Sequence, residues 1–253
     1  MGVLAEILAE KAENIAELRA RRLPEPPPAR RFSLRRAEGD ALRLIAEIKF
    51  RSPSAGALST ALGVAARAAA YERAGASMVS VLTDRRFFDG AWEHLAEARQ
   101  ATTLPLLCKE FVVDERQLDA ARSYGADAVL IIVRCVPHER VRALVAGARE
   151  RELEPFVEIT NDTEARVALD AGATLVGVNA RDLDALAMDP ERAARTLADL
   201  PKDVTSVRLS GLSTPADVER VRSGPAHAAL IGEALMRADD PEPLLRSLVA
   251  AAG

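Results

Sequence analysis

Short apolar runs alternate with longer helical stretches along most of the chain. From residue 41 onward each apolar run is followed by a polar loop, by a stretch rich in Ala, Leu, Arg and Glu, and by a Gly-Ala pair or a similar turn. Glycine at such a turn suits the end of a helix, and a short apolar run bounded by turns is typical of a buried strand. The predicted strands are LIAEIK (44–49), MVSVLT (78–83), LPLLCK (104–109), AVLIIV (128–133), PFVEI (155–159), TLVGVN (174–179), TSVRLS (205–210) and AALIG (228–232).

Eight strand–helix units of under about 30 residues each fit a (β/α)8 barrel, in which parallel strands alternate with helices. The competing interpretation is a doubly wound open sheet, which would carry a G-x-G-x-x-G turn after its first strand. Here that turn reads FRSPSAGAL (50–58) and holds a single glycine. The pattern therefore predicts an α/β fold, a single (β/α)8 TIM barrel with an extra N-terminal helix.

The first 40 residues follow a different pattern from the rest of the chain. Apolar residues at close to helical spacing predict a helix near residues 3–21, and PEPPPARR (24–31) predicts a stiff linker that cannot continue it. We expect residues 1–40, the helix and the Pro-rich linker, to pack on a catalytic barrel formed by residues 41–253. The apolar positions of the helix are Leu4, Ile7, Leu8, Ile15 and Leu18.

Composition and charge narrow the classes of function. The net charge of -4 and the aromatic content of 4% argue against a nucleic-acid-binding surface. No apolar stretch is long enough to cross a bilayer, and the N-terminus lacks the pattern of a signal peptide, so we expect a cytoplasmic protein that does not contact membranes. Cys108 and Cys135 lie in or beside apolar runs and are expected to be packed thiols rather than a disulfide.

Lysine is scarce in this chain. Of its 34 basic residues only four are lysines, and two of these, Lys49 and Lys109, end predicted strands; the others are Lys11 and Lys202. Arginine cannot release a proton near neutral pH, whereas a partly buried lysine can. The placement of Lys49 and Lys109 therefore hints at proton chemistry.

Polar side chains gather where the predicted strands end. Glu47 and Lys49 lie two residues apart and so point to the same face of their strand. The C-terminal ends of barrel strands surround the active site in this fold class. A single charge there most often forms a structural salt bridge, but opposite charges converging on one mouth suit acid–base chemistry. The other polar residues in such positions are Lys109, Glu158, Asn179 and, in the loop that follows, Arg181.

The last two strand–helix units carry a second feature that bears on ligand binding. The segment LSGLSTPADV places Ser210 and Gly211 at the end of strand seven, and LIGEALM places Gly232 and Glu233 at the end of strand eight. Loops after these two strands, with glycines that expose backbone N–H groups, form the usual phosphate site of such barrels. The plainer interpretation is that these glycines only turn the chain.

Seven motifs resemble those of one enzyme family. The chain is similar to indole-3-glycerol phosphate synthase, in chain order and over nearly its whole length, including the N-terminal helix. The resemblance implies a cofactor-free and metal-free lyase of tryptophan biosynthesis that closes the indole ring of 1-(2-carboxyphenylamino)-1-deoxyribulose 5-phosphate, with loss of carbon dioxide and water. The motifs are AEIKFRSPSAG (46–56), VLTDRRFFDG (81–90), CKEFVVDERQL (108–118), PFVEITND (155–162), GVNARDL (177–183), SGLSTPADV (210–218) and IGEALMRADDP (231–241).

The resemblance also implies roles for the candidate residues. Lys109 would be the general acid that protonates the substrate ketone, and Glu158 the general base for the later proton removal. Lys49 would hold the substrate's anionic groups and share in the dehydration, with Glu47 orienting it. Phe111 would pack on the substrate ring.

The remaining residues would bind the substrate at its two ends. Asn179, counted with the catalytic residues, and Arg181 would shape the anthranilate side of the pocket. The residues expected to hold the phosphate are Ser52, Ser210, Gly211, Gly232 and, through its backbone N–H, Glu233.

Three positions depart from the family pattern. Leu209 stands where the family usually has Glu, which removes a carboxylate from the mouth and is expected to leave a lysine short of a partner. Cys108 replaces a common Arg, and Glu110 replaces the usual Asp. These changes leave the rate, the pH optimum and the place of the enzyme in primary or specialised metabolism open.

Other functions compete with that of the synthase. A relative acting on a modified anthranilate-derived substrate and a non-catalytic barrel that binds a phosphate ligand are the alternatives, and a sister enzyme such as phosphoribosylanthranilate isomerase would not explain the motifs together. The expected partner is a phosphorylated small molecule, with no nucleic acid and no membrane. A monomer is expected, and association with other enzymes of the tryptophan pathway stays open.

Overall fold

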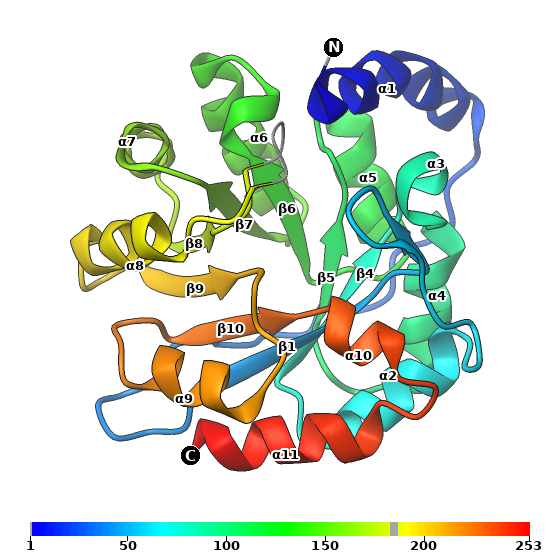
Figure 1. The fold of residues 1–253 in the computed structure, drawn as a ribbon. Helices are drawn as coiled ribbons and strands as arrows, with labels where there is room; N and C mark the ends of the chain where they lie inside the picture. The colour runs from blue at the N-terminus through cyan, green and yellow to red at the C-terminus, as the bar shows by residue number, and fades with distance from the viewer. Residues whose placement is uncertain (1, 183–186) are drawn as a thin grey trace.

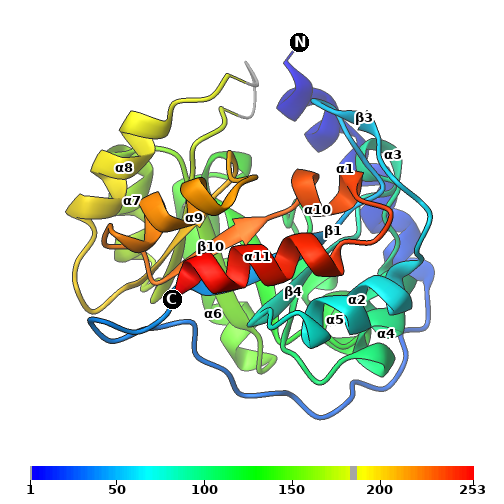
Figure 2. The same ribbon diagram turned by 60° about the horizontal axis from the view of Figure 1, so that its bottom comes forward.

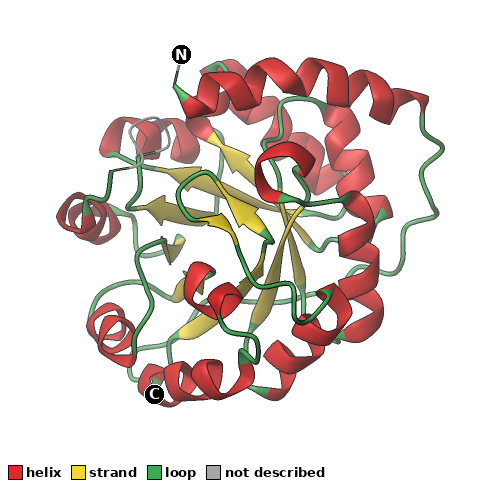
Figure 3. Cartoon of the chain, turned by 45° about the vertical axis from the view of Figure 1, so that its right-hand side comes forward, coloured by secondary structure: helices red, strands yellow, loops and turns green. Residues whose placement is uncertain are grey.

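A closed barrel forms the centre of the molecule. The computed structural model describes residues 2–182 and 187–253, and in these residues eight parallel strands close into a barrel in the order β1-β10-β9-β8-β7-β6-β5-β4 (Figure 1). Figure 3 shows the strands in the middle of the molecule with helices packed around them. The predicted TIM barrel is therefore confirmed, as is the N-terminal helix.

The observed strands match the predicted apolar runs closely. Five predicted ends lie one residue too far along, because Lys49, Thr83, Val133, Ser210 and Gly232 already belong to the loops at the barrel mouth. The barrel strands are β1 (Arg43–Ile48), β4 (Met78–Leu82), β5 (Leu106–Lys109), β6 (Ala128–Ile132), β7 (Glu154–Ile159), β8 (Leu175–Asn179), β9 (Thr205–Leu209) and β10 (Ala228–Ile231). A small antiparallel pair, β2 (Arg51–Ser52) and β3 (Gly56–Ala57), folds the loop after β1 back on itself.

Local signals explain where several helices begin. Asp114 and Thr214 each form a capping box with the residue three positions on, and proline occupies the first turn after Thr214. The helices are α1 (Val3–Ala20), α2 (Val64–Arg73), α3 (Arg85–Phe88), α4 (Trp92–Ala101), α5 (Glu115–Ser123), a 3-10 turn (Val133–Cys135), α6 (His138–Glu150), α7 (Asp162–Asp170), α8 (Pro190–Asp199), α9 (Pro215–Arg222), α10 (Glu233–Arg237) and α11 (Glu242–Ala252).

The apolar core has two parts, because strand side chains alternate between the two faces of the barrel wall. One face of each strand packs outward against the helices, as Val79, Val129 and Val157 do. The other face fills the barrel interior, with Ile45 and Phe156 fully buried. The burial of both faces explains why the strands read as continuous apolar runs.

The N-terminal segment reaches both ends of the barrel. Leu4 and Ile7 of α1 and Leu34 of the linker all belong to the interior cluster. Figure 2 shows the linker, in blue, leaving α1 and running around the bottom of the view to the start of β1. The division of the chain at residue 40 stays a prediction, but α1 and the linker both pack on the barrel, which begins with β1 at Arg43.

The linker holds the N-terminal end of the barrel through arginine side chains. The Arg30 guanidinium donates to the carbonyl of Leu104, ahead of β5, at 2.7 Å. Arg36 donates to the carbonyl of Ala226, ahead of β10, at 2.9 Å, and also to those of Arg222 and Gly224. Among the helices of the described residues, none is long and apolar enough to cross a membrane.

Candidate active site

The twelve candidate residues line one cavity at the C-terminal mouth of the barrel, with a volume of about 500 Å³. They come from the ends of β1, β5, β7 and β8 and from the loops after β1, β5, β8, β9 and β10. The structure thus brings together the residues predicted from the strand ends, from the loops after strands seven and eight and from the family resemblance, although the roles of these residues stay predictions. The twelve are Glu47, Lys49, Ser52, Lys109, Phe111, Glu158, Asn179, Arg181, Ser210, Gly211, Gly232 and Glu233.

Glu47 and Lys49 form an ion pair at the mouth. The Lys49 Nζ lies 2.8 Å from Glu47 Oε1, while Ser80 on the neighbouring β4 donates to Glu47 Oε2 at 3.4 Å. Burial alone would raise the pKa of Glu47, but the charges of Lys49 and Lys109 outweigh it and hold the pKa below its ordinary value. Glu47 is therefore a carboxylate at neutral pH.

Lys109 and Glu158 form the second pair across the barrel interior. The Lys109 Nζ lies 2.9 Å from Glu158 Oε2, and the Asn179 amide donates to Glu158 Oε1 at 2.8 Å. Burial acts to lower the pKa of Lys109, but the negative charges of Glu158 and Glu47 outweigh it and raise the pKa above its ordinary value. Lys109 is therefore protonated and able to donate.

Asn179 continues this contact toward the next loop. Its Oδ1 accepts from the Ser210 hydroxyl at 2.7 Å and from the backbone N–H of Arg181 at 2.9 Å. These contacts fix the orientation of the amide, so that its nitrogen faces Glu158. Lys109, Glu158, Asn179 and Ser210 form one connected chain of hydrogen bonds.

Leu209 does not leave a lysine without a partner, so that expectation was wrong. Each lysine of the mouth has its own carboxylate, Lys49 with Glu47 and Lys109 with Glu158. Leu209 belongs to the apolar barrel interior and is 2% exposed. A Cβ added at Gly177 would come within 2.7 Å of its Cδ1, so the barrel is tightly packed beneath the site.

The loops after β9 and β10 form the polar side of the cavity. Ser210 and Gly211 both have positive φ, 60° and 77°, which turns the chain sharply after β9. A Cβ at Gly232 would lie 2.5 Å from Glu47 Oε1. Glycine is therefore needed at position 232 to leave room for the Glu47–Lys49 pair, a reason that sequence reasoning did not supply.

The opposite side of the cavity is apolar, and sequence reasoning found only Phe111 there. The Phe111 ring lies 6.0 Å from that of Phe88, measured between centroids. Val3, Leu4 and Ile7, from the first turns of α1, complete this side. The spacing of apolar residues in α1 predicted a packed helix, but nothing in the sequence pattern indicated that its first residues line the cavity.

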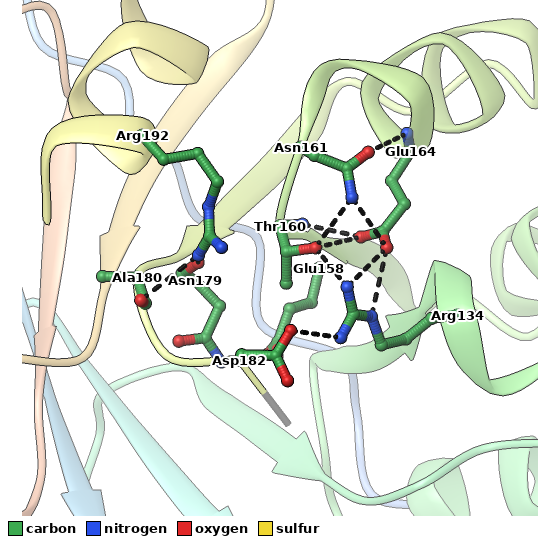
Figure 4. A network of polar contacts seen from close by, with 9 residues as sticks. All are labelled: Arg134, Glu158, Thr160, Asn161, Glu164, Asn179, Ala180, Asp182 and Arg192. Carbon is green, nitrogen blue, oxygen red and sulfur yellow. Dashed lines mark hydrogen bonds and ion pairs between the residues drawn. The ribbon is translucent and has the colours of Figure 1, made fainter. Parts of the chain in front are cut away.

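A second polar network ties neighbouring loops together beside the cavity (Figure 4). The Arg134 guanidinium donates to Glu164 of α7 at 3.0 Å, to the Thr160 hydroxyl at 2.6 Å and to Asp182 at 3.2 Å. These partners follow β7 and β8, so Arg134 joins the loops after three consecutive strands. The last residue of the motif GVNARDL, Leu183, lies outside the described residues.

The cavity combines charges of both signs with an apolar wall that suits an aromatic ring. Its basic residues can contact an anion and its carboxylates can act as bases. The charged residues of the lining are Lys49, Lys109, Arg181, Arg237, Glu47, Glu110, Glu158 and Glu233. Among residues 2–182 and 187–253, no cluster of three or more His, Cys, Asp or Glu side chains has the arrangement of a metal site.

Comparisons with known proteins agree with this geometry. A family model described as indole-3-glycerol phosphate synthase matches residues 4–248. The indole-3-glycerol phosphate synthase of Exiguobacterium sp. is 38% identical over 98% of this chain and 96% of its own length. The indole-3-glycerol phosphate synthase 2 of Streptomyces coelicolor is 40% identical over 98% and 99%.

The likeness to the following solved structure concerns the fold alone. The 3-hexulose-6-phosphate synthase of Salmonella typhimurium superposes with a TM-score of 0.67 at 13% identity, covering 83% of this chain and 98% of that chain. At this identity the likeness supports the barrel and says nothing about the reaction.

Proposed function

Because the chain belongs to the indole-3-glycerol phosphate synthase family, we propose that it converts 1-(2-carboxyphenylamino)-1-deoxyribulose 5-phosphate into indole-3-glycerol phosphate, carbon dioxide and water. The observation that carries the proposal is the pair of lysine–carboxylate contacts in one cavity, Lys49 with Glu47 and Lys109 with Glu158. The reaction needs an acid, a base and fixed positive charge, and these contacts supply all three.

Ring closure is the first chemical step. The ring carbon that bears the carboxylate attacks the ketone carbon, a C–C bond forms, and the electrons of the C=O bond move to its oxygen. Lys109 donates a proton to that oxygen, and its raised pKa keeps it protonated until then. Glu158, 2.9 Å from its ammonium, fixes the direction of donation.

Decarboxylation and dehydration complete the indole. The carboxylate leaves as carbon dioxide, and the electrons of the broken bond restore the aromatic ring. The new hydroxyl then leaves as water, while the five-membered ring loses a proton. We assign the removal of that proton to Glu158, which Asn179 orients, and assistance to the departing hydroxyl to Lys49.

Substrate binding uses the two sides of the cavity. Phe111, with the first residues of α1, contacts the aromatic ring. Arg181, whose backbone N–H donates to Asn179, lines the cavity beside that residue and helps to shape the anthranilate side. The Ser210 hydroxyl already donates to Asn179, so we assign its backbone N–H to the phosphate. The other groups assigned to the phosphate are Ser52, Gly211, Gly232 and the backbone N–H of Glu233.

Turnover of the synthetic substrate tests the proposal. Purified protein should produce indole fluorescence, and mass spectrometry should find the product lighter by one carbon dioxide and one water. An inactive protein that binds the substrate tightly would instead support a non-catalytic binding barrel.

We also propose that the protein acts as a cytoplasmic monomer on a phosphorylated small molecule. Among the described residues, Met188, at 38%, is the large apolar side chain with high exposure, which argues against an apolar seam between subunits. Cys108 and Cys135 are both buried thiols that form no disulfide, as expected in a reducing compartment. Light scattering on a sizing column should give the mass of one chain, 27.1 kDa.

A further inference from the structure

Lys11 is one of the chain's four lysines, and the proposed chemistry does not use it. It lies on α1 and is only 2% exposed. Its ammonium contacts two carboxylates that are equally buried, Asp84 after β4 and Glu110 after β5, at 2.5 Å each. One buried charge thus joins three segments that are far apart in the sequence.

The ion-pair centre of Lys11, Asp84 and Glu110 is well satisfied by hydrogen bonds. Asp84 Oδ1 accepts from the backbone N–H of Phe87 at 2.8 Å. Glu110 accepts from the Thr83 hydroxyl at 2.6 Å and from the backbone N–H of Phe111 at 3.0 Å. Removing the cation would leave two buried carboxylates facing each other, which is strongly unfavourable.

The ion-pair centre adjoins the substrate cavity directly. Glu110 stands between Lys109 and Phe111 in the sequence, and the Lys11 Nζ lies 5.7 Å from the centroid of the Phe111 ring. Lys11 is also one turn beyond Ile7, which lines the cavity together with Leu4. The same contacts therefore hold both parts of the apolar wall, the α1 part and the Phe111 part.

We propose that Lys11 is a positioning residue for substrate binding, which acts through Asp84 and Glu110 to hold α1 and Phe111 as the wall against the substrate ring. This inference rests on the proposed function, because the ring belongs to the proposed substrate. Lys109 is held separately by Glu158, so the loss of Lys11 disturbs binding more than the chemical step.

The Lys11→Met variant tests the proposal by two readouts. Its KM should rise at least about tenfold, the loss expected when an apolar contact with the substrate is removed. Its kcat should change less than about threefold, because binding common to the ground state and the transition state is lost. The dissociation constant of the alcohol obtained by reducing the substrate's ketone, which cannot close the ring, should rise in parallel with KM.

Glu10→Gln is the matched control. Glu10 also joins α1 to the α3 segment, through Arg86 at 3.0 Å, but the Arg86 side chain is 66% exposed. The control should bind the alcohol as the wild type does. An equal loss in both variants, or wild-type affinity in Lys11→Met, would overturn the proposal.

A second variant shows whether Lys11 acts through Glu110. Lys11→Met/Glu110→Gln removes one of the facing carboxylates and should bind with an affinity between those of Lys11→Met and the wild type. Affinity no better than that of Lys11→Met would contradict this route. If Lys11→Met does not fold, the double variant should still bind more weakly than the wild type, and wild-type affinity would overturn the proposal.

Two further measurements distinguish a loss of folding from a loss of substrate binding, and the role of Lys11 from the proposed function. Trp92, the chain's single tryptophan, lines a cavity of about 210 Å³ together with Lys11, Leu18 and Arg21, so its emission reports whether α1 stays docked. A wild type that binds the alcohol without turnover would contradict the proposed function, while the dissociation constants would still decide the role of Lys11. A wild type that does not bind the alcohol would contradict both.

Discussion

The two ends of the barrel use charge in opposite ways. At the C-terminal mouth, Lys49 and Lys109 contact carboxylates that point into the same cavity. At the N-terminal end, Arg30 and Arg36 of the linker donate to backbone carbonyls, which are uncharged and do not exchange protons. The lysine–carboxylate pairs of the mouth can give or take protons, whereas these two arginines make fixed hydrogen bonds to backbone oxygens.

The difference follows from the chemistry of the two cations. Arginine stays charged and offers several donors in a plane, which suits the joining of carbonyls from adjoining turns. Lysine can release its proton when its surroundings favour it, which suits a group that must act on a substrate. We therefore expect substitutions at the mouth to alter kinetics and those at the other end to alter stability.

The largest difference between the two ends should come from two glutamates of the same strand. Glu158→Gln removes the proposed base at the mouth and should lower kcat by about 10²–10⁴-fold. Glu154→Gln, at the start of β7, where the carboxylate accepts from Thr174, should leave kcat within about threefold. Steady-state kinetics on both variants measures this, and equal losses would remove the distinction between the ends.

Two lysines offer a second comparison. Lys49→Ala removes a charge that we propose to face the substrate's anions, so KM should rise by about 10–100-fold, the loss of affinity expected when a hydrogen bond to a charged group is removed. Lys202→Ala changes an exposed lysine in the loop before β9 and should leave KM as it is. Fluorescence assays over a range of substrate concentrations give both values. A wild-type KM for Lys49→Ala would show that Lys49 does not hold the substrate.

A substitution in the linker should change the stability of the protein and leave its kinetics unchanged. Arg36→Met removes hydrogen bonds to the carbonyls of Ala226, Arg222 and Gly224 and should lower the free energy of unfolding by about 1–2 kcal/mol. Its kcat should match that of the wild type. Urea unfolding measures the change, with the exposed Arg31→Met as the control. A drop in kcat without a drop in stability would link this end to the chemistry.

The smallest effect concerns a pH-dependent contact between the loop after β9 and the start of α9. Burial would raise the pKa of Asp217, but hydrogen bonds from the N–H groups of Ser213 and Thr214 and from the Thr214 hydroxyl lower it to about 2. Its stabilising contribution is therefore complete above the ordinary value of 3.8 and lost as the pH falls toward 2. Asp217→Asn should cost about 1 kcal/mol at neutral pH, as the loss of a helix cap does.

Thermal unfolding across the acid range measures this contribution. The melting temperatures of the wild type and Asp217→Asn should converge as the pH falls through that window. A constant difference at all pH values would show that the charge of Asp217 is not what stabilises the start of α9.

Much of the fold and the site was predictable because strand periodicity places side chains simply. Glu47 and Lys49 lie two apart, and the structure puts their charged atoms 2.8 Å apart. The glycines that end helices and the cap at Thr214 likewise act within a few residues. Such local signals fix where strands end, and the ends of parallel strands meet at one mouth.

The parts that were missed depend on contacts between distant segments. The partners of Lys11 lie 73 residues or more away in the sequence, so no local sequence pattern predicts the ion-pair centre. The consequence expected of Leu209 was wrong for the same reason. Whether a lysine has a partner depends on which strands are neighbours across the mouth, and Glu158 reaches Lys109 from β7.

Lys109 offers the most direct test of the central claim, that the mouth holds an exchangeable proton rather than mere positive charge. The decisive measurement is the kcat of Lys109→Arg beside those of Lys109→Ala and the wild type, from indole fluorescence at saturating substrate. Arginine keeps the charge but cannot donate its proton near neutral pH, so we expect both variants to lose at least about 10²-fold in kcat. If Lys109→Arg kept most of the wild-type rate, charge alone would be enough, and the assignment of Lys109 as the general acid would be wrong.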